Sequence, residues 1–388
     1  MNPIEWIAQR LGYERRSTEE PSWNAIAPGT GYYGGLSARA AENLSAVLAC
    51  STVIATSLAS IPALVYRREG EKRVEAMGHP LYRISRHGVN EGMTWPDFIE
   101  HLVASALLSG NGLAEIKRNA NGGLIGFEFI PWSTVSVALL QSGRLRYEVN
   151  DPRGGSRRLL QGEVIHLRDR TDGNGIGISR LARAAETMTT VQASNTFARK
   201  FLENSAQPSG FIKAENDLTP EQIEDLRSQM RERYSGTANA GRVGILTAGL
   251  EWVQAQISPE DAELLESRKF GVEEVCRLFQ VPPPLVQDYS HNTFTNSETA
   301  GRWFAMFTLA PWARKIEAEF ARSVFTSSGA FEMELDLSGF LRGDPATRWN
   351  AHKIAIDAGV LDPDEVRQVE GWNPRPKPAP IPASKMTI

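Results

Sequence analysis

FQVPPPL, residues 279–285, ends one predicted helix and begins a polar loop, and the rest of the chain is interpreted from this stretch. The helix before it is predicted to start at Ser258, a serine N-cap followed by Pro259 and two acids in the first turn. Three successive prolines end it, because proline lacks the N–H of an inner turn and its ring clashes with the turn before. The segment 287–297, QDYSHNTFTNS, is polar with almost no formal charge. A second long helix follows and is expected to bend at Pro311.

Composition sets the limits on what this chain can be. With 388 residues it has enough material for one large domain or two to three ordinary ones. A formal charge of −4 excludes a general nucleic-acid-coating protein, which would be basic. No stretch of about 18 consecutive apolar residues is present, so no membrane span is expected. The first residues lack a basic region followed by an apolar run, so a signal peptide is not expected either. A cytosol-like compartment is therefore expected.

The two cysteines of the chain, Cys50 and Cys276, both fall in predicted helices. They are interpreted as buried thiols rather than as a disulfide. No cysteine–histidine cluster has the spacing of a zinc site, so no metal is expected.

The first half of the chain mixes helices with hairpin-like strands. Residues 1–38 are polar and glycine-rich and are interpreted as a flexible arm. Helices are predicted at 39–60 and 95–108. Several strands are separated by Asn-Gly, Ser-Gly and Gly-Gly pairs, which favours antiparallel hairpins. The predicted strands are 62–67, a short return strand after the turn at Gly70, 113–118, 126–130, 134–140, 145–149 and 164–167.

The second half is mainly helical. A helix of about 25 residues is predicted from Ser179. A compact insert follows, with a helix at 219–234 whose start is marked by the capping box of Thr219 and Gln222. After the two long helices described above, a strand at 331–337 and a final helical pair are predicted. The predicted fold class is therefore α+β.

Signals for an enzyme are weak. The glycine-rich stretch 173–177 could approach a phosphate, but Ile178 breaks the Gly-x-Gly-x-x-Gly pattern, and a flexible joint into the next helix is favoured. His166, in a predicted strand, is interpreted as a hydrogen-bonded core residue rather than a general base. Glu273 and Glu274 are adjacent on a helix and point in different directions. No catalytic residue and no cofactor are predicted, and the sequence argues against an enzyme.

The order of short motifs between residues 40 and 325 resembles that of portal proteins, the head–tail connectors of tailed double-stranded DNA bacteriophages. Each motif alone is weak, but many of them occur here in the family's order. The chain departs from the family pattern at its short C-terminus, so a large helical crown is not expected. The motifs are GHPLY (78–82), MTWPDF (93–98), LLSGNG (107–112), EVIH (163–166), GISRL (177–181), FLENSAQPSG (201–210), LLESRKF (264–270), FQVPP (279–283), TNSE (295–298) and LAPW (309–312).

The resemblance implies a ring, usually of twelve subunits, at one vertex of a virion or phage-like particle assembled in the bacterial cytoplasm. Such a ring is the channel for double-stranded DNA during packaging and ejection. The implied partners are further copies of the chain, the major capsid protein, the terminase large subunit, the head–tail adaptor and non-specific double-stranded DNA, with no membrane. The implied segments are an arm (1–38), wing (39–178), first stem helix (179–207), clip (208–257), second stem helix (258–281), tunnel loop (282–297), kinked helix with wing return strand (298–344), short crown (345–373) and Pro-rich tail (374–388).

The tunnel loop is the expected DNA contact. Each phosphate neutralised by Lys or Arg releases counterions and tightens binding, so a lining with little charge suits a duplex that has to slide. From composition alone an ordinary solvated surface loop is the alternative. The expected channel residues are Tyr289, Ser290, His291, Asn292, Thr293, Thr295 and Asn296.

Charged residues of the clip and stem are the other candidate sites. The clip helix carries mixed charges that suit an exchangeable docking surface for terminase and then the adaptor. In the stem, basic Arg180 and Arg183 are expected to pair with acidic Glu263 and Glu266 of a neighbouring subunit, although acids near a helix N-terminus are also explained by the macrodipole. The clip residues are Glu221, Glu224, Asp225, Arg227, Arg231 and Arg233.

Two other functions stay open at this point: another head–tail or tail ring component of the same particle, or a nucleotide-dependent enzyme that uses the glycine-rich stretch. Adaptors are generally much shorter than this chain, which argues against the first. The sequence leaves open whether the particle is an infectious phage, a prophage remnant or a gene transfer agent. Subunit number also stays open, since it depends on the interface angle.

Overall fold

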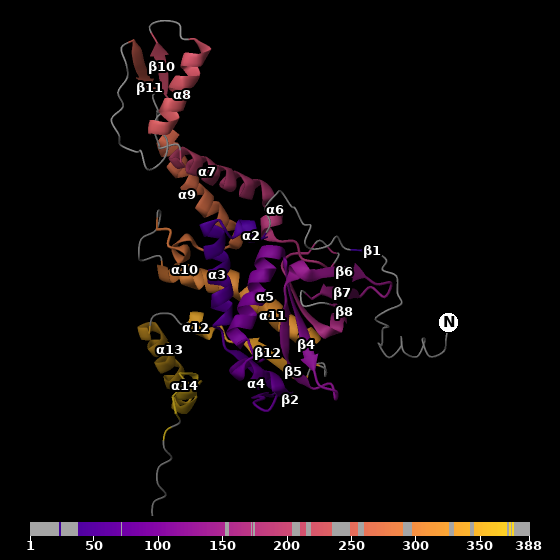
Figure 1. Cartoon of the computed structure of the whole chain (residues 1–388). Coiled ribbons are helices and arrows are strands. Elements are labelled where there is room, and N and C mark those ends of the chain that lie inside the picture. The colour runs from indigo at the N-terminus through magenta and orange to yellow at the C-terminus, as the bar shows by residue number, and fades with distance from the viewer. Residues whose placement is uncertain are drawn as a thin grey trace, which may run out of the picture. The chain divides into compact units, whose positions relative to one another are not determined.

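Helices and antiparallel sheets alternate along the chain in the computed structural model (Figure 1), which confirms the predicted α+β class. Two compact units are present, Met1–Asp336 and Leu337–Ile388, and each is described by itself. Within the described part of the chain, no helix is long and apolar enough to cross a membrane. The structure describes residues 23–24, 38–70, 72–151, 155–171, 173, 175–203, 210–214, 219–234, 249–254, 260–289, 297–325, 330–341, 345–370, 372–373 and 375.

Two helices, α3 (Ser45–Ala59) and α5 (Trp95–Ser109), pack against each other in the core of the first unit. The start of α5 is a capping box in which Thr94 and Asp97 satisfy each other's backbone N–H groups, and its C-cap is Gly110 with φ 87°. The helix predicted at 39–60 is instead two helices, because a turn separates α2 (Ala38–Ala41) from α3.

Three antiparallel sheets belong to the same unit, and α5 packs against the strands of one of them, β5-β4-β9. Their strand orders are β5-β4-β9, β1-β6-β7-β8 and β12-β2-β3. Every strand predicted in the first half is present, including the short return strand after Gly70, which is β3, while β1, β8 and the helix α4 (Pro80–His87) lie outside the ranges predicted for strands and helices. The bounds are β1 Trp23–Asn24, β2 Ala63–Glu69, β3 Lys72–Glu75, β4 Asn111–Arg118, β5 Leu124–Ile130, β6 Val135–Leu139, β7 Leu145–Asn150, β8 Ser156–Leu160, β9 Val164–Arg168 and β12 Phe331–Leu335, with short 3-10 turns at Trp132–Thr134 (η1) and Gln161–Glu163 (η2).

The predicted stem and clip correspond to a second group of elements. The helix predicted from Ser179 is divided at Ala184 into α6 (Arg180–Arg183) and α7 (Ala185–Glu203), and α7 contacts α9 (Glu260–Phe279). Between α7 and α9 come β10 (Gly210–Ala214), α8 (Pro220–Tyr234) and β11 (Leu250–Gln254), with β10 and β11 paired antiparallel. The predicted capping box of α8 is confirmed: the Thr219 amide donates to Gln222 Oε1 at 2.9 Å.

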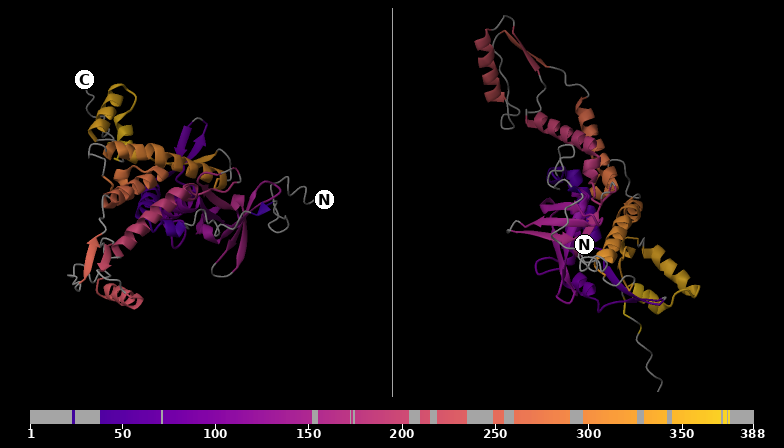
Figure 2. Two further views of the ribbon diagram at one scale, coloured as in Figure 1. Left: turned by 90° about the horizontal axis from the view of Figure 1, so that it is seen from above. Right: turned by 90° about the vertical axis from the view of Figure 1, so that its right-hand side faces the viewer.

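The long helix after the tunnel loop is irregular one turn before its proline. It consists of α10 (Ser297–Phe304), a π-helical turn at Ala305–Leu309 (η6) and α11 (Ala310–Ser323), seen from two further directions in Figure 2. Pro311 has no N–H for the carbonyl of residue 307, and its ring would crowd that carbonyl. A wide π turn takes up this mismatch. The structure thus contains a π turn just before Pro311, and the expected bend at Pro311 itself stays a prediction.

The second unit is a small helical hairpin. Its helices are α12 (Ser338–Leu341), α13 (Pro345–Asp357) and α14 (Pro363–Val369). The carboxylate of Glu370 lies 3.0 Å from both Arg348 Nε and His352 Nε2, and it joins the end of α14 to α13. Trp349 and Trp372 add a ring contact at 5.6 Å.

Candidate functional site

The beginning of α6 and the end of α9, which belong to the predicted stem, meet at Arg180. Its Nε lies 2.9 Å from Asp169 Oδ2, and its Nη1 donates to the carbonyls of Leu278 and Phe279 at 3.4 and 3.2 Å. These are the last carbonyls of α9, which lack partners inside the helix and attract a cation. Arg180 therefore holds the end of α9 against the segment that follows β9.

The kinked helix reaches the same point through Trp312 and Lys315. Lys315 Nζ donates to the Arg168 carbonyl at 3.1 Å and lies 3.9 Å from Asp169 Oδ1. Both Lys315 and Arg180 lie over the Trp312 ring, at 4.9 and 5.7 Å from its centroid. Burial lowers the pKa of the Lys315 ammonium. Asp169, whose side chain is 6% exposed, thus joins α6 to α11. We call Asp169, Arg180, Trp312 and Lys315 the stem junction.

The N-terminal end of the predicted tunnel loop is held in place next to the stem junction. Gln280 ends α9 with a left-handed backbone, φ 60°, and its carbonyl accepts the hydroxyl of Thr308, which lies in the π turn. A 3-10 turn, η4 (Pro283–Val286), follows, and the Asp288 amide donates back to the Pro283 carbonyl at 3.1 Å. The π turn therefore supports the chain immediately before the loop.

Of the expected channel residues, only Tyr289 is described, and its side chain is 57% exposed. The loop is followed by α10, which begins at Ser297. The other expected channel residues lie outside the described part of the chain: Ser290, His291, Asn292, Thr293, Thr295 and Asn296.

A buried polar network at His166 connects the wing sheets to the origin of the stem. Tyr147 Oη lies 2.9 Å from His166 Nδ1, and Asn111 Oδ1 lies 2.9 Å from Nε2. Asn111 Nδ2 also donates to the Gly177 carbonyl, and Asn111 Oδ1 accepts the Gly177 amide, both at 2.8 Å. The backbone of Gly177 therefore fixes the orientation of the Asn111 amide. The Glu319 carboxylate of α11 accepts the His166 amide at 2.7 Å.

This network also fixes the protonation state of the histidine. Because Asn111 presents its oxygen, His166 Nε2 must carry the proton, and Nδ1 then accepts the Tyr147 hydroxyl. Burial lowers the pKa of His166 well below its usual range, so the ring is neutral. Burial likewise raises the pKa of Tyr147. The interpretation of His166 as a hydrogen-bonded core residue is confirmed.

The glycine-rich stretch before the stem is held in place at its end. A Cβ at Gly177 would lie 2.0 Å from the Gly110 carbonyl oxygen, so no side chain fits there. Gly177 also forms a bridge with Thr171 and bonds to Asn111 on both its amide and its carbonyl. The stretch is a joint as predicted, but its predicted flexibility is wrong at Gly177, because tertiary contacts fix the backbone.

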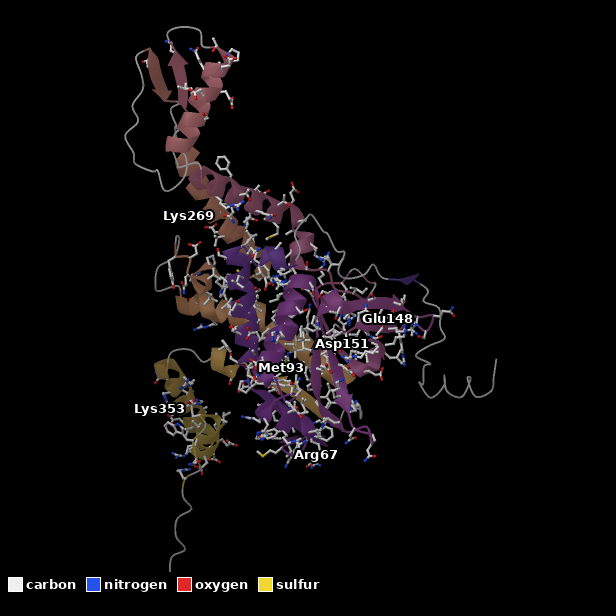
Figure 3. The ribbon with its side chains drawn as sticks, in the orientation of Figure 1. Arg67, Met93, Glu148, Asp151, Lys269 and Lys353 are labelled. Atoms are coloured by element: carbon white, nitrogen blue, oxygen red, sulfur yellow. The ribbon has the colours of Figure 1, made fainter. Side chains whose placement is uncertain are left out.

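The clip and stem residues are only partly described. Glu221, Glu224 and Asp225 are exposed on α8. Arg183 is exposed at the end of α6, where it donates to the Arg170 carbonyl at 3.3 Å, and Lys269 is exposed on α9 (Figure 3). The side chains of the other five expected residues lie outside the described part of the chain: Arg227, Arg231 and Arg233 on α8, and Glu263 and Glu266 on α9.

Arg180 is committed within its own chain to Asp169 and the end of α9. Arg183 also has a contact within its own chain, to the Arg170 carbonyl, and the expected pairing of the two arginines between subunits stays a prediction. Sequence reasoning did not single out Asp169, Thr308 or Asn111. Asn111 stands inside the quoted LLSGNG motif and Asp169 follows the EVIH strand, but their partners are distant in sequence.

Comparisons with known proteins show which proteins the chain is similar to in sequence and fold. The probable portal protein of Streptomyces phage phiC31 is 28% identical over 349 residues, covering 87% of this chain and 76% of that protein. The portal protein of Enterobacteria phage HK97 is 29% identical over 342 residues, covering 86% and 80%. A chain in the neck of an empty gene transfer agent particle, solved with C6 symmetry, has a TM-score of 0.62 at 24% identity, covering 92% and 96%.

The sequence model of one family, described as phage portal protein, matches residues 45–371. The match includes α7, α8, α9 and the helices α10 and α11. The chain belongs to the phage portal protein family.

Proposed function

We propose that copies of this chain form a ring at one vertex of a phage or phage-like particle, and that its central channel conducts double-stranded DNA during packaging and ejection. The observation that carries the proposal is the family match over residues 45–371, which spans every element from α3 to α14. A ring of twelve is the expected stoichiometry by resemblance to the family. The loop 287–297 is proposed to line the channel.

Exposed apolar side chains on the kinked helix support assembly with further copies. Trp303, Met306 and Phe307 are 61%, 52% and 58% exposed, and the Trp303 and Phe307 rings lie 5.7 Å apart. Spacings of three and four residues place them on one side of the helix. In a ring each subunit contacts its neighbours through two different surfaces, and burial in such a contact removes this apolar area from water.

Electron microscopy of the purified full chain tests the ring directly. End views are expected to contain closed rings with a central opening, and class averages give the subunit number. A protein that stays monomeric at all concentrations used for assembly, or that forms open filaments, would contradict the proposal.

The exposed acids of α8 are proposed to belong to the surface that docks the packaging terminase and afterwards the head–tail adaptor. The full cap of α8 supports this, because it stabilises the helix within a small insert. Crosslinks from Glu221, Glu224 and Asp225 in assembling particles are expected on terminase, and those in finished particles on the adaptor. Crosslinks that lead to the major capsid protein instead would exclude this assignment.

The stem is proposed to carry a charge contact between subunits, with Arg183 facing Glu263 or Glu266 of the neighbour. One exposed pair contributes only about 0–1 kcal/mol, so the effect depends on repetition around the ring. Arg183→Glu is expected to weaken ring assembly most at low salt, where screening is least. Light scattering across a salt series measures it, with Arg83→Glu on the exposed side of α4 as control. Equal assembly of both variants at low salt would argue against the contact.

A further inference from the structure

The two cysteines of the chain face each other across two packed helices. Cys50 lies in the middle of α3 and Cys276 near the end of α9, 226 residues later, and both are fully buried. Their sulfur atoms are 3.9 Å apart, and the Cys50 thiol donates to the Cys276 sulfur. We propose that Cys50 and Cys276 are a redox-responsive pair that closes to an intramolecular disulfide under oxidising conditions and locks the end of α9 to α3.

Little movement is required for this bond. A disulfide has an S–S length of about 2.05 Å, so the sulfur atoms need to approach by roughly 1.9 Å, which rotation about the two Cα–Cβ bonds supplies together with small helix shifts. Both are free thiols in the structure, and they are the only cysteines in the sequence. No other disulfide within one chain can therefore compete.

The chemistry is thiol–disulfide exchange with a small soluble disulfide as the oxidant. The hydrogen bond from Cys50 lowers the pKa of Cys276 and raises the pKa of Cys50, so Cys276 ionises first and is the nucleophile. Its thiolate attacks one sulfur of the oxidant and releases one thiolate. Cys50 then loses its proton and attacks the Cys276 sulfur, which releases the second. Two protein thiols are oxidised, and the small disulfide is reduced to two thiols.

Because both sulfurs are buried, the first attack requires local opening of the last turns of α9. This segment is close to the predicted tunnel loop. The Cys276 carbonyl accepts the Val281 amide at 2.9 Å, and the Gln280 carbonyl accepts Thr308. Closing the disulfide therefore fixes the chain immediately before η4. In a reducing cytosol the pair stays open, and an oxidising medium outside the cell closes it.

The experiment counts thiols in the full chain after incubation in reduced or oxidised glutathione, in buffer and in sub-denaturing urea. Samples are denatured and alkylated with iodoacetamide, and the protein mass measured by mass spectrometry gives the number of labelled thiols. Reduced protein is expected to carry two labels and oxidised protein none, with a Cys50–Cys276 peptide after digestion. The crosslink restricts the unfolded chain, so the oxidised form is expected to melt roughly 5 °C or more above the reduced form.

Cys50→Ala and Cys276→Ala are the matched controls, and neither is expected to change its melting temperature with the redox buffer. Two labels on the wild type after oxidation, in buffer and in urea alike, would overturn the proposal. A glutathione adduct as the end product would also overturn it, since the second thiol would then have failed to attack. A closed disulfide without a rise in melting temperature would refute the lock. These readouts concern single chains, so they do not depend on the proposed ring.

Discussion

Asn111→Ala is expected to lower the free energy of unfolding by roughly 3–9 kcal/mol, at about 1–3 kcal/mol for each of three buried polar groups left without a partner. Three groups lose their partner at once: His166 Nε2–H, the Gly177 amide and the Gly177 carbonyl. Each lies in the interior, where water cannot readily replace the amide. Part of the loss comes from the joint before α6, because Asn111 holds Gly177 in place.

Urea unfolding of the full chain, followed by tryptophan fluorescence, measures this loss. Asn350→Ala, at an exposed position of α13, is the control and is expected to change stability by less than about 0.5 kcal/mol. Asn111→Asp keeps the size and one acceptor but cannot donate to the Gly177 carbonyl, so it is expected to be destabilised as well. An Asn111→Ala protein as stable as its control would mean that the network does not hold the joint.

Features that depend on neighbouring residues in the sequence were predictable. The start of the helix predicted at 95–108, the capping box at Thr219 and the stop at Pro282 each depend on side chains within a few positions. The helix α4 was not predicted, although Pro80 stands at its start. Its cap is the imidazole of His79, whose Nδ1 accepts the Leu81 amide at 3.2 Å, and histidine is not an ordinary N-cap residue.

A charged strand, β8, was the second kind of miss. β8 reads SRRLL, which lacks the alternation of a half-buried strand. Its arginines are accommodated by acids on other strands: Arg157 Nη2 lies 2.9 Å from Glu115 Oε2, and Arg158 Nε lies 3.0 Å from Glu148 Oε1 (Figure 3 labels Glu148). Such pairing follows from strand register, which a single sequence does not contain.

The stem junction and the His166 network were not predictable for the same reason. Asn111 and Gly177 are 66 positions apart, and Arg180 and Phe279 are 99 apart. Taken alone, each of these residues is explained by its local position: Asn111 by a turn, Gly177 by the glycine-rich joint and Arg180 by a helix start. Only the packing of α9 and α11 onto the wing brings their polar atoms together. The family resemblance supplied the order of the segments but not these contacts.

Deleting residues 290–296 is expected to leave the ring assembled and to remove most of its capacity to package DNA. The segment SHNTFTN contains no Lys, Arg, Asp or Glu. The elements on its two sides are held in place: η4 contacts α3, and Ser297 is the first residue of α10. The deletion therefore takes no charged partner from the stem junction. If the loop lines the channel, its loss removes the lining that contacts the sliding duplex.

DNase-protected DNA per particle measures packaging, and electron microscopy of the same particles checks the ring. Asn292→Gln with Asn296→Gln keeps the length and the lack of charge, and it is expected to package as the wild type does. Asn292→Lys with Asn296→Lys also keeps the length but adds two cations per subunit, each of which can neutralise a phosphate and tighten binding. That variant is expected to package slowly, and added salt is expected to restore its rate because counterion release then contributes less. Normal genome filling by the deletion would show that these residues do not act on DNA, even where the ring itself is present.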